Sequence, residues 1–194
     1  ESRYSLSYMF STRTHLPSLM SLVDITDESN PLYIRQGNPD LKASRSYNHN
    51  FIWSFGKKAM NTVNLMYSYT TNSMTQSSSY DMTTGVTRTR AENINGNNNL
   101  SLYDNIFWYF GKNEQFFLTA NTSVSRSHSV ELMSTNGAEP VKNSANTWSI
   151  GENLRFEWRI NGRHRIGVTC NARNSRTDSN REGFNKVNAF NVNY

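Results

Sequence analysis

The fold class is decided by two similar stretches, Phe51-Ile52-Trp53-Ser54-Phe55-Gly56-Lys57-Lys58 and Ile106-Phe107-Trp108-Tyr109-Phe110-Gly111-Lys112-Asn113. In both stretches every second side chain is large and apolar, and a tight turn follows at once. This pattern is typical of a β-strand that has one face against lipid or a core, with an aromatic ring at the boundary. The two stretches therefore predict strands of one amphipathic kind.

The same alternation recurs along most of the chain, with one parity apolar and the other polar. The apolar parity holds Tyr4, Leu6, Tyr8 and Phe10; Val63, Leu65, Tyr67 and Tyr69; Phe116, Leu118, Ala120 and Val124; and Trp148, Ile150, Leu154, Phe156, Trp158 and Ile160. No comparable stretch keeps the i, i+3, i+4, i+7 stripe of an amphipathic helix. We predict eight strands, at about residues 3–12, 44–55, 61–72, 87–110, 115–126, 147–160, 164–174 and 184–194.

The composition argues against a sheet that encloses an ordinary soluble core. Only 36% of residues are hydrophobic and the mean hydropathy is -0.71, yet aromatic residues reach 12%, too many for a disordered chain. A closed sheet with an apolar outside and a wet inside satisfies both observations, because only one face of each strand has to be hydrophobic. We predict an all-β chain of antiparallel, up-and-down transmembrane β-barrel strands. It begins inside a strand pattern, as we expect of a mature protein or an excised piece.

The connections between the predicted strands alternate between short and long. Short ones lie at about residues 56–60, 111–114 and 161–163, and long polar ones at about 13–43, 73–86, 127–146 and 175–183. Outer-membrane barrels have this asymmetry, with tight periplasmic turns and longer extracellular loops. Trp53, Trp108 and Trp158 precede short turns, where a periplasmic aromatic girdle belongs, and Trp148 lies at the opposite end of its strand.

A motif opens the second predicted strand, in a strand-loop-strand context. It reads Gly37-Asn38-Pro39-Asp40-Leu41-Lys42, and it follows Ser7-Tyr8-Met9-Phe10-Ser11 and Asn30-Pro31-Leu32 and precedes Glu92-Asn93-Ile94-Asn95-Gly96. These residues resemble the barrel of TonB-dependent receptors, in particular the outer-membrane β-barrel family common in Bacteroidetes. The resemblance covers about residues 2–110, and Ala43-Ser44 stands where the family often continues Pro-Glu.

The resemblance implies a plugged barrel of roughly 22 strands, of which eight are about a third. We therefore expect residues 1–194 to be a single β-barrel segment without a plug domain, part of a larger barrel in the cell outer membrane. The implied partners are outer-membrane lipid, the plug domain of the same full-length protein, TonB indirectly, and an unidentified small ligand. Because eight strands can close by themselves, a small autonomous barrel is the alternative.

The sequence does not predict an enzyme. The four histidines do not form a nucleophile constellation with a serine or with Cys170, which we expect only to pack. Asp24, Asp27 and Glu28 form a short acidic run that we interpret as a solvated loop, so no metal site and no cofactor is predicted. Basic and aromatic residues separate onto opposite faces of the strands, which argues against nucleic-acid binding.

Basic residues gather on the polar parity of the last strands, in a chain of net charge +5. If those strands pair, they form a cationic stripe on the lumen wall, made of Arg155, Arg159, Arg163, Arg165 and Arg173. The stripe is either a path for an anionic ligand or a contact for an acidic plug. We favour a third interpretation, a solvated wall whose charge Glu157 and other strands neutralise.

Three polar residues, His49, Asp104 and Glu152, occupy the otherwise apolar parity. A charge that faces lipid near the midplane costs up to about 2 to 4 kcal/mol for Arg or Lys, and less for Asp or Glu. We expect a β-bulge that reverses the parity there, since the Asn that follows each of the three tolerates unusual backbone angles. Contact with a partner and a place near the interface are the alternatives.

The leading functional hypothesis is a binding and transport module: part of the barrel wall of a TonB-dependent receptor for a nutrient ligand, unable to transport by itself. The loops at residues 13–36 and 127–146 are the predicted ligand contacts, with Tyr33 and Arg35 as anchors, because aromatic and guanidinium groups dominate recognition surfaces. A small closed barrel that acts as an adhesin or membrane anchor is the second hypothesis. A soluble calycin-like carrier is the third, but it leaves the tryptophans at short turns unexplained.

Overall fold

The computed structural model describes residues 3–135, 138, 140–160, 164–180 and 187–193. Its elements are β1 (Arg3–His15), α1 (Leu19–Leu22), β2 (Thr26–Asp27), β3 (Tyr33–Gln36), β4 (Ser44–Gly56), β5 (Ala59–Thr71), β6 (Ser73–Tyr80), β7 (Thr87–Ile94), β8 (Asn98–Phe110), the 3₁₀ turn η1 (Lys112–Glu114), β9 (Phe116–Thr135), β10 (Val141–Arg159), β11 (Arg165–Ser179) and β12 (Val187–Asn193). Within these residues no helix has the length and apolar character needed to cross a membrane.

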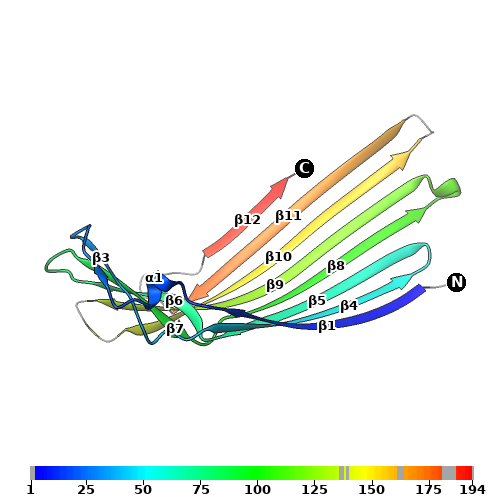
Figure 1. Ribbon diagram of the computed structural model, residues 1–194. Coiled ribbons are helices and arrows are strands. Elements are labelled where there is room, and N and C mark those ends of the chain that lie inside the picture. Colours follow the sequence, from blue (N-terminus) through cyan, green and yellow to red (C-terminus); the bar gives the residue numbers. More distant parts are fainter. Residues whose placement is uncertain (1–2, 136–137, 139, 161–163, 181–186, 194) are drawn as a thin grey trace.

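Eight long strands form one curved antiparallel wall, in the order β1-β4-β5-β8-β9-β10-β11-β12 (Figure 1). This confirms the predicted all-β class and the up-and-down connection of the wall. Within the described residues, β1 pairs only with β4 and β12 only with β11. The sheet is therefore open, with β1 at one edge and β12 at the other.

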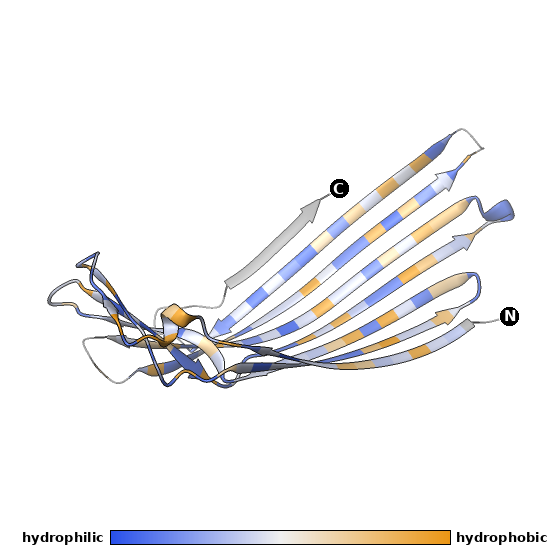
Figure 2. Cartoon of the chain, in the orientation of Figure 1, coloured by the Kyte–Doolittle hydropathy of each residue, from blue (hydrophilic) through white to orange (hydrophobic). Residues whose placement is uncertain are grey.

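The wall has one apolar and one polar face, and Figure 2 shows the resulting bands of alternating hydropathy along the strands. Register places apolar residues opposite one another from strand to strand, as in the row Phe51, Leu65, Leu102, Val124 and Ile150. Many large apolar side chains of this face are exposed, whereas the buried hydrophobic residues among those described are only Leu41, Ile94 and Val130. A wall that exposes its apolar face in this way is built to meet lipid.

The aromatic residues near the short connections form a belt on the apolar face. Trp53 packs on Phe55 and Trp108 on Phe110, each with ring centroids 4.5 Å apart. Phe116 continues the belt, 5.3 Å from Phe110 and 6.2 Å from Trp158. All three predicted girdle tryptophans therefore lie at the same end of the wall. Trp148 lies toward the other end, with the Arg126 guanidinium 5.9 Å from its ring centroid.

Four predictions about strands and loops are wrong at the end of the wall opposite the short turns. The predicted strand 87–110 is two strands, because Gly96 adopts a φ of +133° between β7 and β8. The predicted loop 73–86 contains strand β6, and the predicted loop 127–146 is mostly the extended ends of β9 and β10. Strand β11 likewise continues to Ser179 through the predicted loop 175–183. Polar residues dominate both parities of these segments and apolar ones such as Val130 and Leu132 do not alternate regularly, so the pattern does not distinguish them from loops.

Pairing between segments distant in sequence stabilises this end of the wall. Strand β6 runs parallel to the end of β9, from Ser77 opposite Leu132 to Tyr80 opposite Thr135. Strand β3 runs parallel to β7, and β2 pairs with β3. The strands of the first loop and the β6–β7 hairpin thus continue the sheet beyond the wall, where Figure 1 shows α1, β3, β6 and β7 gathered.

The predicted bulge at His49, Asp104 and Glu152 is wrong. The ladders from β4 through β11 run without an extra residue, so the three side chains lie on the apolar face. The Asn after each of them keeps ordinary strand pairing, because an uninterrupted ladder satisfies more backbone groups than a bulge does.

Candidate ligand-contact sites on the wall and its loops

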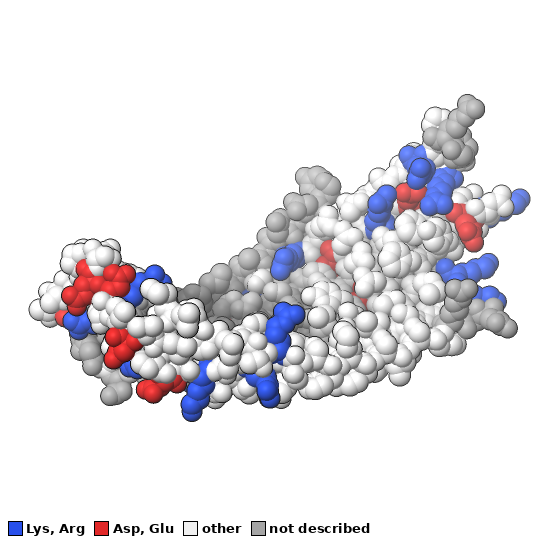
Figure 3. Space-filling model, in the orientation of Figure 1, with Lys and Arg blue, Asp and Glu red and all other residues white. Residues whose placement is uncertain are grey.

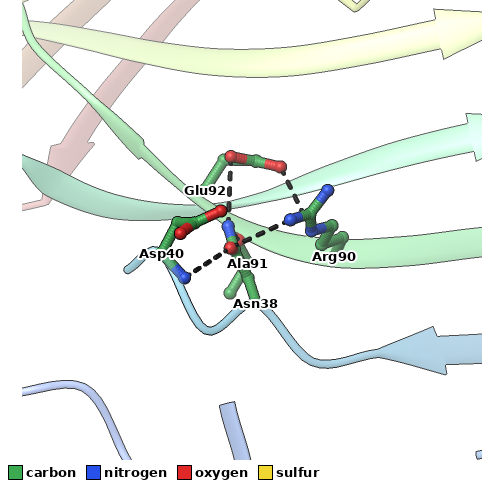
Figure 4. Close-up of polar contacts among 5 residues, drawn as sticks. All are labelled: Asn38, Asp40, Arg90, Ala91 and Glu92. Atoms are coloured by element: carbon green, nitrogen blue, oxygen red, sulfur yellow. Dashed lines mark hydrogen bonds and ion pairs between the residues drawn. The ribbon is translucent and has the colours of Figure 1, made fainter. Parts of the chain in front are cut away.

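The first long loop is fastened to strand β7 by the side chain of Asn38, which is 3% exposed (Figure 4). Its amide Nδ2 donates to the Ala91 carbonyl at 2.8 Å and to the Glu92 carboxylate at 3.2 Å. Its Oδ1 accepts from Arg90 Nη2 at 2.9 Å and from the Asp40 backbone N–H at 3.1 Å. The contacts of this one side chain attach the loop to β7, and we call Asn38, Arg90 and Glu92 the loop latch.

A second amide extends the attachment. Asn93 Oδ1 accepts from the Lys42 backbone N–H at 2.7 Å, and Asn93 Nδ2 donates to the carbonyls of Lys42 and Asn72 at 3.0 and 2.8 Å. The segment beginning at Gly37 and the segment beginning at Glu92, which carry the family resemblance, are therefore in direct contact. The sequence displays both segments, and the one signal of their contact is the density of Asn, whose side chain both donates and accepts.

Gly37 lets the loop approach itself closely. A Cβ built on this residue would lie 1.7 Å from the Val23 carbonyl oxygen, so no other side chain fits there. The Gly37 N–H donates to the Ile25 carbonyl at 3.1 Å, and the Asn38 N–H donates to the Ser21 carbonyl at 2.7 Å. These bonds hold α1 and β2 beside the latch.

A cleft of about 430 Å³ lies between this loop and the β6–β7 hairpin. Apolar and polar residues share its lining, among them Met20, Ile25, Arg35, Met74 and Gln76. Of the predicted ligand anchors, Arg35 lines the cleft, and the Tyr33 hydroxyl beside it accepts from Gln76 Nε2 at 3.5 Å. The structure thus places Arg35 in a recess that suits an amphipathic ligand, while Tyr33 contacts a residue of its lining.

Two carboxylates outside the wall are held by hydrogen bonds. The Thr84 hydroxyl and the backbone N–H of Thr83 lower the pKa of Asp81, with Oδ2 2.8 Å from the hydroxyl and Oδ1 2.8 Å from the N–H. Hydrogen bonds from Ser29 likewise lower the pKa of Asp27. Both carboxylates therefore order turns of the loop region while ionised.

Four of the five predicted stripe arginines lie on the polar face of the wall, and Arg163 lies outside the described residues. Three of the four converge on the carboxylate of Glu157, which is 6% exposed. The distances from Glu157 are 3.2 Å to Arg155, 3.0 Å to Arg159 and 3.9 Å to Arg165. The fourth, Arg173, lies opposite Gly151, six residues along the strand from the position that faces Glu157.

Glu157 compensates one of three guanidinium charges, so this part of the polar face keeps a net positive charge. Arg159 also lies over two aromatic rings of the same face, 5.6 Å from the Tyr109 centroid and 6.0 Å from that of Phe117. Figure 3 shows charged side chains at both ends of the molecule and further Lys and Arg side chains between them. The predicted stripe is therefore a compact cluster near the short turns plus one separate arginine.

The polar residues on the apolar face find partners within the sheet. The ring of His49 accepts from or donates to the Tyr8 hydroxyl at 2.9 Å and lies 5.0 Å from Phe10. The Thr122 hydroxyl donates to Glu152 at 2.6 Å, and Thr122 is also the register partner of Asp104. Asp104 Oδ1 is buried and has no hydrogen-bond partner among the described residues.

Among the described residues no group of three His, Cys, Asp or Glu side chains is arranged to hold a metal ion. Cys170 is exposed on the apolar face, opposite Leu154.

Comparison with known proteins gives one match. A family model described as "Outer membrane protein beta-barrel family" matches residues 1–191. No curated protein and no solved structure matches the chain significantly.

Proposed function

We propose that this chain forms part of the barrel wall of a TonB-dependent receptor of the Bacteroidetes type. The chain belongs to the outer membrane protein beta-barrel family and is located in the outer membrane. The wall takes part in the uptake of a nutrient ligand and does not transport by itself. On this proposal residues 1–194 are one barrel segment, and the chain is not an enzyme.

The observation that carries the proposal is the open, two-faced wall. The seven strands from β1 to β11 in this wall present apolar side chains on one face and polar side chains on the other, and within the described residues β1 and β12 each pair on one side only. A larger barrel uses such a segment to separate lipid from an interior wide enough for a plug. Location in the outer membrane is incompatible with the soluble carrier considered above.

The two ends of the wall support an orientation. The tight turns and the belt of Trp53, Trp108 and Trp158 belong at the periplasmic rim, and the extended sheet of β2, β3, β6 and β7 belongs outside the cell. In this orientation the cleft beside Tyr33 and Arg35 faces the medium and receives the ligand. The cluster around Glu157 faces the lumen near the periplasm, where it contacts the plug domain. TonB is a partner of this wall only indirectly.

Disulfide scanning in the full-length protein separates a wall segment from a small closed barrel. In a Cys170→Ala background, Ser7→Cys is combined with single cysteines across β12, and the control pairs Ser7→Cys with Ile52→Cys. The control residues are register partners in β1 and β4, close enough for a disulfide.

We expect the control pair to cross-link and the β1–β12 pairs to remain reduced. A disulfide between β1 and β12 of one molecule would overturn the proposal. It would establish a closed eight-strand barrel, as the adhesin or anchor hypothesis requires.

A further inference from the structure

A groove of about 480 Å³ lies on the polar face of the wall, across β8 to β11. Two adjacent rows of register partners build it. One row consists of Asn105, Asn121, Asn153 and Asn171, and the other of Tyr103, Ser123, Gly151 and Arg173. The groove is separate from the cleft beside Tyr33 and Arg35 and from the Glu157 cluster.

The asparagine row is a directed chain of side-chain amides. Asn121 Nδ2 donates to Asn153 Oδ1 at 3.1 Å, and Asn153 Nδ2 donates to Asn171 Oδ1. Each amide has two N–H donors and an oxygen with two lone pairs, so these bonds use only part of its capacity. Asn105 makes no side-chain hydrogen bond to any described residue. The row therefore offers both donors and acceptors to a ligand.

The second row adds an aromatic surface and one position without a side chain. Tyr103 is 41% exposed and has no aromatic or hydrogen-bonding neighbour among the described residues, whereas Tyr109 of the same strand stacks on Phe117 at 4.5 Å. Gly151 contributes no side chain, and the Ser123 hydroxyl donates to the Gly151 carbonyl oxygen at 3.4 Å.

We propose that this groove is a subsite for an uncharged, hydroxyl-rich ligand, namely a sugar ring of an oligosaccharide that crosses the lumen. A sugar ring presents a C–H face to an aromatic side chain and hydroxyls that donate and accept, which match the amide row. The groove holds one cation, Arg173, and the Glu152 carboxylate at its edge bonds Thr122 on the opposite face. The inference rests on the proposed receptor function and names its substrate class.

The test measures binding by the protein as extracted from the outer membrane, in a detergent without a sugar headgroup. The probes are neutral hexasaccharides of glucose, xylose and mannose, a galacturonic acid hexamer, and a neutral hexapeptide. Tyr103→Ala removes the aromatic ring from the groove. Its control is Phe107→Ala, because Phe107 is 43% exposed and lies on the same face outside the groove.

Gly151→Ala narrows the groove, because the new Cβ lies 2.8 Å from the Ser123 hydroxyl, which can rotate. Its control is Gly167→Ala on the same face, where the new Cβ lies at an ordinary 3.5 Å from the Phe156 carbonyl oxygen. We expect at least one neutral hexasaccharide to bind, with its Kd raised roughly three- to ten-fold by each groove variant and less than about two-fold by each control.

The inference is overturned if no neutral hexasaccharide binds, if groove and control variants bind it equally, or if only the acidic hexamer or the peptide responds to the groove variants. The disulfide scan of β1 and β12 tests, without any ligand, whether these two strands pair and close the barrel. Failure of saccharide binding with β1 and β12 unlinked therefore overturns the substrate class and leaves the receptor proposal standing.

Discussion

Replacing Asn38 with alanine tests how the loops are held to the wall. The change removes four hydrogen bonds from a side chain that is 3% exposed. A neutral hydrogen bond contributes about 1 kcal/mol and one to a charged group about 1.5 to 3 kcal/mol. Arg90 and Glu92 are part-exposed and remain paired with each other at 3.5 Å, so we count each of the four bonds at slightly less than the value of a neutral one. The expected loss is about 3 kcal/mol.

Hydrogen–deuterium exchange measures this loss locally. A loss of about 3 kcal/mol raises the population of the open loop roughly 100-fold. Amides of β3 and β7 should therefore exchange roughly 100-fold faster in Asn38→Ala, while those of β4 and β5 keep their protection because the wall ladders are unchanged.

The matched control is Asn30→Ala in the same loop. Asn30 is exposed, and its side chain accepts one local hydrogen bond, from the Leu32 N–H at 3.1 Å. We expect less than about a ten-fold change in that variant. Equal exchange in the two variants would refute the latch, and faster exchange throughout the wall would show that Asn38 supports the whole sheet.

Three further changes have distinct expected outcomes. Hydrogen bonds from Thr84 keep the folded pKa of Asp81 below its unfolded value. The turn between β6 and β7 should therefore lose protection from hydrogen exchange as the pH falls through that lowered pKa. Asp81→Asn should remove this pH dependence. Glu157→Gln leaves three guanidinium groups without their shared carboxylate, so urea unfolding in detergent should show a larger loss of stability than in Glu114→Gln, an exposed control. Asp104→Leu removes a carboxylate from the lipid-facing parity and should raise the free energy of unfolding by about 1 to 2 kcal/mol, whereas a decrease would indicate a polar partner on this face.

The wall strands could be predicted because each meets two different environments. In β4, Phe51 and Trp53 face lipid while their neighbours face the polar side, and this contrast is written locally in the sequence. The short turns and the tryptophan belt follow from the same local pattern. Strand β6, with residues such as Ser77 and Ser78, is polar on both faces and carries no such contrast. Its pairing with β9 depends on residues about 55 positions away.

The candidate sites show the same division. Tyr33 and Arg35 were identifiable as recognition residues from their type and their place in a long loop. The cleft beside them was not, because Met74 and Gln76 of the β6–β7 hairpin contribute to its lining. The groove beside Tyr103 was not identified either, since four asparagines spread over residues 105–171 form a row only when four strands are in register.

The strand class, the two faces and the end of the wall at which the tryptophans lie can all be predicted from local alternation, because alternation is a property of each strand alone. Which residues meet depends on the folded arrangement. Asn38 reaches Arg90, and Glu157 gathers arginines from two strands, because strand order and register bring distant segments within hydrogen-bonding distance. The open edges at β1 and β12 are likewise decided by pairing, which depends on the arrangement of whole strands and not on their local pattern.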